Sequence, residues 1–163
     1  MILNLRIVKV DSNYCNYLRI FDSKVIYNMD NKESRPYIGV LFEMNHFEYY
    51  APLTSPKPKH LKMKNTIDFY KIKNGQLGAI NLNNMIPVTN YNYTLINLNE
   101  KVFIEDKVKY LTLLKEQLNW LNSNYIQIIF KLRRNRLNYM KCILIINYQK
   151  ILNLGVAILD FLN

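Results

Sequence analysis

The sequence predicts an α+β fold in one domain, with about five or six short strands in an antiparallel sheet and helices packed against it. The chain has 163 residues, about the length of one domain, and half of them are hydrophobic. Several short runs rich in β-branched and aromatic side chains precede residue 100. From about Ile104, the apolar residues instead recur with the period of a helix.

The first elements expected are a strand and a short helix. Residues 3–10 alternate loosely between apolar and polar side chains, which is typical of a strand. Asp11 and Ser12 favour the start of a helix, and an amphipathic helix is expected through about Asp22. Residues 22–35 are polar and are expected to form a loop. The apolar face of the helix holds Tyr14, Tyr17, Leu18 and Phe21.

A β-hairpin is expected next. Residues 36–44 and 47–53 are both rich in strand-forming side chains, and Asn45 and His46 between them favour a turn. Three more short strands are expected at residues 67–73, 77–84 and 93–99, with a turn at Asn74-Gly75 between the first two. The helix that begins near Ile104 has an apolar stripe of Leu111, Leu114, Leu118, Leu121 and Tyr125.

The net charge is +10, from 22 basic and 12 acidic residues, and the excess is clustered. Residues 57–73 carry six lysines against the single acid Asp68, and residues 131–150 carry six basic side chains and no acid. Such a domain attracts polyanions, nucleic acid first and anionic membrane surfaces second. Thirteen tyrosines and seven phenylalanines could stack unpaired bases, so single-stranded RNA is the predicted partner. The alternative is that an AT-rich genome enriches these residue types and that the lysines only solvate a surface.

Several functional classes are not favoured. Cys15 and Cys142 lie far apart and form no CxxC pair, so neither a disulfide framework nor a zinc site is expected. The two histidines are His46 and His60, and His46 falls in the predicted turn, which argues against a two-histidine ribonuclease. The acids are scattered without paired carboxylates, which argues against a two-metal nuclease. We therefore expect neither a metal nor another cofactor.

No association with a membrane is expected. Asn4 and Arg6 interrupt the first apolar run, which is therefore unlike a secretory signal. The most apolar segment, residues 143–162, is interrupted by polar side chains, which argues against a membrane span. The sequence predicts a soluble, cytoplasmic protein.

The segment TSPKPKH, residues 54–60, has two interpretations. In the structural one, Ser55 caps a short, solvated basic helix with Pro56 in its first position. In the functional one, the prolines hold Ser55 and Lys57 near extended geometry. The hydroxyls of Thr54 and Ser55 then bind phosphate oxygens, and Lys57 stabilises a phosphorane-like transition state. RNA carries its own nucleophile, the 2′-OH, so such a site needs only to align it, polarise the phosphate and move protons.

Longer runs carry a family resemblance. RPYIGVLFEMNHFEYYAPLTSPKPKH (residues 35–60), GQLGAINLNNMIPV (75–88) and the helix-forming NYCNYLRIFDSKV (13–25) resemble the ToxN/AbiQ family of type III toxin–antitoxin endoribonucleases. The resemblance covers roughly residues 5–130, and APLTSPK and GAINLNNMIPV are its most specific parts. It implies a fold like that of MazF and Kid toxins, with a twisted antiparallel sheet or small barrel and packed helices. It also implies metal-independent cleavage of single-stranded RNA, often at adenine-rich sites, that leaves a cyclic phosphate.

The resemblance also implies a site, residue by residue. Thr54, Ser55 and Lys57 match the family's Thr-Ser-Pro-Lys signature, in which the hydroxyls orient the 2′-OH or the phosphate. Tyr14 matches a site tyrosine that stacks a base or shuttles a proton. Arg35 takes a place where relatives carry Lys or Arg and is expected to stabilise charge with Lys57. The side chains expected to bind RNA are Tyr27, Lys59, His60, Lys62 and Lys64.

The implied partner is an RNA antitoxin, a repeat-derived pseudoknot that the toxin processes and with which it closes into a hetero-oligomer. Residues 1–163 are expected to form a single toxin domain, although residues 131–163 depart from the family's polar, cysteine-containing ending. A frameshift after about Lys131 is one hypothesis for that departure. Two alternatives stay open from the residues alone: a non-catalytic basic RNA-binding module, and a surface-charged structural or DNA-binding protein.

Overall fold

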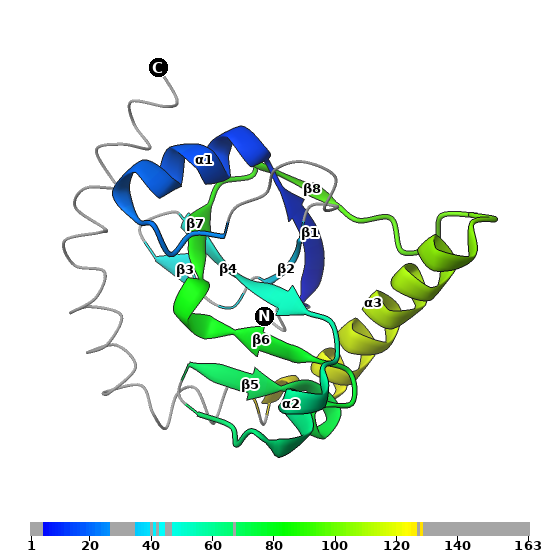
Figure 1. Ribbon diagram of the computed structural model, residues 1–163. Coiled ribbons are helices and arrows are strands. Elements are labelled where there is room, and N and C mark those ends of the chain that lie inside the picture. Colours follow the sequence, from blue (N-terminus) through cyan, green and yellow to red (C-terminus); the bar gives the residue numbers. More distant parts are fainter. Residues whose placement is uncertain are drawn as a thin grey trace.

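One antiparallel sheet organises the chain (Figure 1). β1 (Arg6–Val10) pairs with β2 (Pro36–Gly39) along one edge and with β8 (Tyr93–Leu95) along the other. β2 pairs in turn with β4 (Phe47–Thr54). The structure is a computed structural model that describes residues 5–26, 35–39, 41, 43–44, 47–66, 68–126 and 128.

β4 is the longest of the described strands and is paired along both edges. On the side of β2, its beginning also pairs with β3 (Glu43–Met44), which confirms the predicted hairpin. On the other side, β7 (Ile86–Val88) pairs with its first half and β6 (Ala79–Asn81) with its end. β5 (Phe69–Lys71) then adds to β6.

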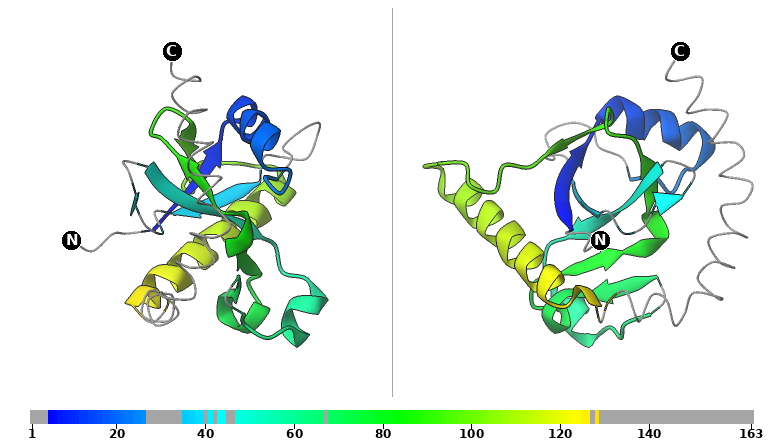
Figure 2. Two further views of the ribbon diagram at one scale, coloured as in Figure 1. Left: turned by 90° about the vertical axis from the view of Figure 1, so that its left-hand side faces the viewer. Right: turned by 180° about the vertical axis from the view of Figure 1, so that it is seen from behind.

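The sheet path runs β5-β6-β4-β2-β1-β8, and each pairing along it is antiparallel. β5 and β8 end this path and do not pair with each other among the described residues. The strands curve around one another (Figure 2), but the described part is an open, twisted sheet rather than a closed barrel. The predicted α+β class is confirmed, and of the two predicted forms, a twisted antiparallel sheet or a small barrel, the structure has the twisted sheet.

The first hydrophobic core lies between the sheet and α1 (Ser12–Phe21). The carboxylate of Asp11 accepts a hydrogen bond from the Tyr14 backbone N–H at 2.9 Å, so the predicted N-cap is confirmed. The helix buries Tyr14, Leu18 and the free thiol of Cys15. These side chains pack against strand residues Val8, Val10, Tyr37, Tyr50, Ile86 and Val88.

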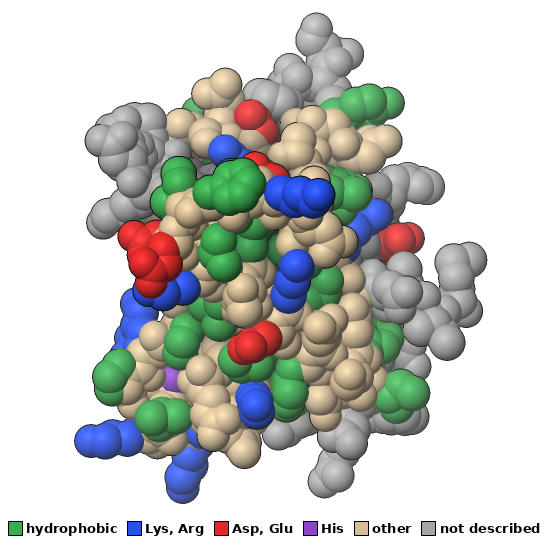
Figure 3. Space-filling view, turned by 90° about the vertical axis from the view of Figure 1, so that its right-hand side faces the viewer, with side chains coloured by type: hydrophobic (Ala, Val, Ile, Leu, Met, Phe, Trp, Pro, Cys, Tyr) green, Lys and Arg blue, Asp and Glu red, His purple; other side chains and the backbone are tan. Residues whose placement is uncertain are grey.

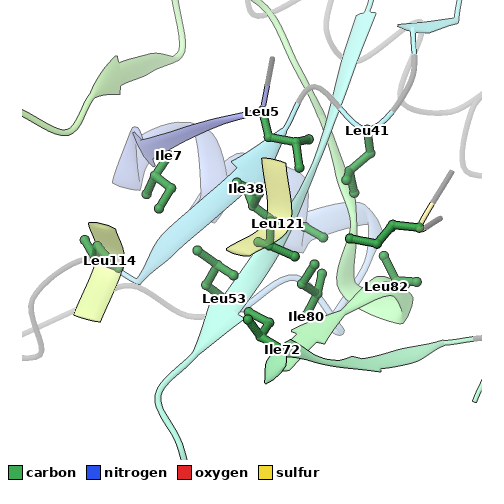
Figure 4. Close-up of a cluster of buried hydrophobic side chains, with 12 residues drawn as sticks. Leu5, Ile7, Ile38, Leu41, Leu53, Ile72, Ile80, Leu82, Leu114 and Leu121 are labelled. Atoms are coloured by element: carbon green, nitrogen blue, oxygen red, sulfur yellow. The ribbon is translucent and has the colours of Figure 1, made fainter. Parts of the chain in front are cut away.

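The second core lies on the opposite face of the sheet, under α3 (Glu105–Ser123). This helix begins next to the predicted Ile104, and its first turn carries two acids, which the helix dipole favours. Its residues Leu114 and Leu121 face side chains of the central strands (Figure 4). Because adjacent strand residues point to opposite faces, both cores draw on the same strands. The strand side of this second core includes Ile7, Ile38, Ala51, Leu53 and Ile80.

None of the described helices is both long enough and apolar enough to cross a membrane.

The structure differs from the predicted elements around β6. The predicted strand at residues 77–84 is shorter, because the 3₁₀ helix η2 (Leu82–Asn84) follows Asn81. β7 was not predicted; it pairs with β4 although Pro87 has no backbone N–H to donate. The predicted turn at residues 74–75 is confirmed within the 3₁₀ helix η1 (Ile72–Gly75), where the chain has positive φ.

Arg6, Gly39 and Tyr50 are neighbours on adjacent strands, on the face of the sheet that α1 covers. Arg6 pairs in register with Gly39, and a Cβ added to Gly39 would lie 2.5 Å from Cδ1 of the Tyr50 ring. Arg6 Nε donates to the Tyr50 hydroxyl at 2.8 Å, and that hydroxyl donates to Glu48 at 2.8 Å. Arg6 also binds the Glu48 carboxylate at 2.6 and 2.5 Å. Glycine at position 39 therefore makes room for the ring that joins the charged pair.

Gly39→Ala should lower the free energy of unfolding by about 1–3 kcal/mol, as overpacking of a core typically does. The Tyr50 ring is fully buried and held by Arg6 and Glu48, so it cannot move aside at low cost. Urea denaturation measures the effect. In a Tyr50→Leu background the same Gly39→Ala change should cost clearly less, and an equal cost in both backgrounds would contradict this account.

Candidate active site

The end of β4 and the beginning of β2 meet at one end of the sheet. Tyr37 pairs with Pro52 in antiparallel register, so the residue that precedes β2 and the last residue of β4 lie on the same side. Arg35 precedes β2, and Thr54 ends β4. The fold therefore brings Arg35 to the sheet end from which Ser55 and the following lysines leave.

The two neighbouring hydroxyls at this end have different environments. The Thr54 hydroxyl donates to the Ala79 carbonyl oxygen at 3.1 Å, so its single hydrogen is already used within the sheet. The Ser55 side chain is exposed, and its hydroxyl makes no hydrogen bond to another described residue. Of the predicted pair, Ser55 is therefore the hydroxyl that can donate to a ligand, whereas Thr54 anchors the strand end.

A short helix follows Ser55, as the structural interpretation of this segment predicted, but it starts later. α2 (Pro58–Lys62) has Lys57 as its N-cap and Pro58 in its first turn, with no side-chain cap. Ser55 is thus not the cap, because the chain stays extended at Lys57 with φ of −136° and ψ of 147°. The Ser55 hydroxyl and the Lys57 ammonium, two residues apart, are therefore both exposed ahead of the helix.

The lysines around α2 form an unneutralised cationic surface. Lys57, Lys59, Lys62 and Lys64 are all exposed, and none forms an ion pair with another described residue. Basic side chains project at the lower edge of the molecule in Figure 3, where α2 lies in Figure 1. The acid Asp68 forms no ion pair with these lysines, and its oxygens accept hydrogen bonds from Thr66 and Asn83. These contacts, that of Thr66 first, lower the pKa of Asp68.

Gly78 and Gln117 contact the end of β4. Neither was predicted from the sequence as part of the site. Gly78 has φ of +97°, and a Cβ there would lie 2.0 Å from the Thr54 carbonyl oxygen. Gln117 of α3 is buried, and its side-chain amide donates to the Thr54 carbonyl oxygen at 3.2 Å. The signal for Gln117 was present, because it is a polar residue one helical turn from both Leu114 and Leu121.

Tyr14 lies in the core rather than at a surface. It is fully buried, and its hydroxyl donates to the Pro87 carbonyl oxygen at 2.8 Å. Burial, followed by interactions with Cys15 and Tyr49, raises the pKa of the Tyr14 hydroxyl far above its usual value. A buried ring offers no face to a base, and a phenol with a raised pKa is a poor proton shuttle. This placement argues against the role predicted for Tyr14 and favours a structural one.

His60 is also buried, with 2% of its surface exposed. Its ring lies 5.6 Å from the ring of Phe69, and Nδ1 has no hydrogen-bond partner in the described part of the chain. A Cβ at Gly75 would lie 2.7 Å from the His60 carbonyl oxygen, so this glycine lets the η1 turn support α2. The predicted contact of His60 with RNA does not fit this burial, which instead anchors the lysine-bearing helix.

Some predicted features cannot be placed. Tyr27, His46 and the basic segment at residues 131–150 lie outside the described residues, as does the apolar tail that follows. Among the residues that the structure does describe, no group of three or more His, Cys, Asp or Glu side chains could hold a metal ion. The tyrosine count also overstates the surface available for stacking, because Tyr14, Tyr37, Tyr49 and Tyr50 are buried.

A family model and several known proteins match this chain in sequence. The model of the ToxN toxin family of type III toxin–antitoxin systems matches residues 6–155, beyond the predicted limit near residue 130. The endoribonuclease ToxN of Bacillus thuringiensis subsp. kurstaki is 32% identical over 125 residues, covering 77% of this chain and 63% of that protein. The chain thus spans less than two thirds of that relative. The endoribonuclease ToxN of Pectobacterium atrosepticum is 33% identical over 135 residues, covering 78% and 77%. The endoribonuclease AbiQ of Lactococcus lactis subsp. lactis is 38% identical over 96 residues, about half of each chain.

Solved structures resemble the fold as well. One, from a study of a processed non-coding RNA that regulates a bacterial antiviral system, has a TM-score of 0.66 and 29% identity, covering 80% of this chain and 83% of that chain. Another, from a study of selective toxin inhibition by a non-coding RNA pseudoknot, has a TM-score of 0.65 and 30% identity, covering 81% and 77%.

The burial of His60 predicts a pH dependence of stability. Desolvation first, and then the charges of Lys59 and Lys57, lower the pKa of His60 below its usual 6.5. The unfolded chain therefore binds the proton more readily, and stability is lost as pH falls below about 6.5. The free energy of unfolding should drop between about pH 7.5 and about pH 5.5, and His60→Leu should remove part of that drop. Denaturation of both proteins at both pH values tests this, and identical drops would contradict it.

Proposed function

This chain belongs to the ToxN toxin family of type III toxin–antitoxin systems, and on that premise we propose that it is an endoribonuclease acting at the end of β4. The observation that carries the proposal is the exposed Ser55 hydroxyl, which no described residue uses, two residues before Lys57, which forms no ion pair within the described part of the chain. A serine with a purely structural role at this place would cap α2, and Ser55 does not. The names of the relatives, both ToxN and AbiQ, support the same activity.

The proposed reaction is transesterification within the RNA strand. The 2′-oxygen attacks the adjacent phosphorus, the bond from phosphorus to the 5′-oxygen breaks, and a 2′,3′-cyclic phosphate and a 5′-hydroxyl remain. Ser55 donates a hydrogen bond that orients the phosphate or the 2′-OH, which aligns the nucleophile with the leaving group. Lys57 and Arg35 offset the charge that builds on the phosphate oxygens in the transition state. The proton of the 2′-OH passes to water, and the leaving 5′-oxygen takes one from water, so the proton balance of the step is zero.

This division of labour needs no metal, because fixed cations supply the positive charge that a metal would otherwise bring. The substrate is single-stranded RNA, since the 2′-OH must rotate into line with the scissile bond, which a regular helix prevents. A preference for adenine-rich sites follows from the family resemblance. The enzyme acts where cellular RNA is found, in the cytoplasm.

The proposed inhibitor is a folded RNA that also occupies this surface. The exposed lysines at positions 57, 59, 62 and 64 extend well beyond one scissile phosphate along the chain. A pseudoknot that wraps this surface neutralises several charges at once and leaves an unpaired end near Ser55. The related structure studied for inhibition by an RNA pseudoknot supports such a partner. We propose that the toxin cuts this RNA from its repeats, and that alternating protein and RNA close into a ring.

Ser55→Ala and Lys57→Ala should each abolish RNA cleavage and growth inhibition while leaving the protein folded, because both side chains are exposed. Cleavage of a long transcript, followed by analysis of the new ends, measures this. Lys101→Ala, another exposed lysine, is the matched control and should cut normally. If Ser55→Ala still cuts as fast as the unchanged protein, the site is wrongly placed.

A chelator separates the proposed mechanism from a metal-dependent one. The unchanged protein should cut equally well in EDTA, because the cations of the site are side chains. Loss of activity in EDTA that magnesium restores would rule out this mechanism. Binding of the transcript without cleavage by the unchanged protein would instead favour the alternative of a non-catalytic RNA-binding module.

Lys62→Gln/Lys64→Gln should weaken binding of the repeat RNA from the same locus and leave the chemical step intact. Each lost phosphate contact should lower the slope of log affinity against log salt by roughly 0.7–0.9. A salt titration of binding measures the slope. Lys107→Gln/Lys109→Gln is the matched control, because these lysines already pair with Glu100 and Glu105. Equal slopes for both double variants would contradict this surface, and purification free of RNA with a protein inhibitor would exclude an RNA antitoxin.

A further inference from the structure

A buried amide interrupts the apolar face of α3. Gln117 lies between Leu114 and Leu121 and has 1% of its surface exposed. Both of those leucines belong to the second core, beneath the sheet. Burying an amide in such a place costs free energy unless its polar atoms are bonded. The identity of this side chain therefore needs an explanation beyond packing.

The hydrogen bonds of Gln117 have a fixed direction. Its Nε2 donates to the carbonyl oxygens of Leu77 at 2.6 Å and Thr54 at 3.2 Å. Because both partners only accept, the nitrogen must face them, and both of its hydrogens are used. Its Oε1 has no partner among the described residues. A leucine or methionine here would remove the unpaired Oε1, but it could not donate to the two carbonyl oxygens as Gln117 does.

The bond to Thr54 acts on the next residue. The Thr54 carbonyl belongs to the peptide group whose nitrogen is that of Ser55, so a fixed oxygen fixes the plane from which Ser55 leaves the strand. A Cβ on Gly78 would lie 2.0 Å from the same oxygen, so glycine allows this close approach, and the Thr54 hydroxyl donates to the Ala79 carbonyl oxygen. The bond to Leu77, directly before Gly78, joins these two segments through one side chain.

We propose that Gln117 is a positioning residue for Ser55: it holds the last peptide group of β4 so that the Ser55 hydroxyl faces the reacting phosphate. This inference rests on the proposed ribonuclease function. On this proposal, α3 contributes no side chain that touches the substrate, but it aligns Ser55 through Gln117.

Gln117→Leu should lower kcat roughly 10- to 100-fold, because small displacements of an aligned group are costly in rate. KM should change much less, since the lysines that hold RNA are untouched. Hydrogen exchange of peptides covering residues 53–60 should become faster in the protein without RNA. The substrate is an oligonucleotide that spans a site first mapped on a long transcript.

Leu121→Ala is the matched control on the same helix. It removes a fully buried side chain of the same core and should lower stability by more than Gln117→Leu does. Its kcat should stay near that of the unchanged protein at a temperature where both are folded. A loss of kcat that simply follows stability across the two variants would overturn the positioning role.

Gln117→Glu supplies a readout that a packing role would not change. An ionised carboxylate repels the two carbonyl oxygens, whereas a protonated one can donate a single hydrogen bond. Burial raises the pKa of such a group, so its kcat relative to the unchanged protein should recover as pH falls. The ratio for Gln117→Leu should stay flat over the same range.

The outcomes separate this inference from the function on which it rests. If the unchanged protein cuts no RNA, the proposed function fails, and faster exchange at residues 53–60 still decides whether Gln117 holds the strand end. If the unchanged protein cuts and Gln117→Leu matches it in kcat and exchange, the proposed function stands and the positioning role is overturned.

Discussion

The pairing of β4 along both of its edges is the constraint on which the rest of the structure depends. β2 and β3 hold one edge and β6 and β7 the other, while hydrophobic cores cover both of its faces. A strand held in four directions has little freedom at its end. The residue that follows it, Ser55, thus leaves a rigid element, and functional groups are most accurately placed on such elements. The pairing of β4 therefore both places Ser55 at the surface and holds together the strands that form the two cores.

The polar groups inside the fold serve this arrangement. Tyr50 is fully buried, and its hydroxyl bonds with both Arg6 and Glu48. Tyr14 is buried too and donates to the backbone of β7, which ties α1 to the edge of β4. Buried hydroxyls are costly unless bonded, and these are bonded across different elements. In the described part of the chain, Tyr14, Tyr37, Tyr49 and Tyr50 are thus core residues, whereas the lysines around α2 are exposed.

The sequence predicted what local rules determine. The N-cap at Asp11 depends on a contact three residues away. The helix near Ile104 depends on apolar residues that recur at helical spacing within one segment. Both could therefore be recognised from the sequence. The start of α2 was misplaced, because Pro56 and Pro58 can each occupy the first turn of a helix, and α2 begins at the second although Lys57 provides no side-chain cap. The burial of Tyr14 and the hydrogen bonds of Gln117 depend on partners at least 40 residues away. The segment at residues 54–60 drew attention because its hydroxyls, cations and prolines are contiguous, and its role as a site stays a prediction.

We propose that the scissile phosphate binds at the end of β4. The most direct test is hydrogen exchange of the protein with and without an RNA whose cleavage-site nucleotide is 2′-deoxy, since this analogue binds but lacks the nucleophile. The account predicts protection of the segment from Thr54 through Lys62 and of Arg35. Protection confined to the exposed apolar residues at the start of α3, Phe103 and Ile104, with none at Ser55, would contradict it.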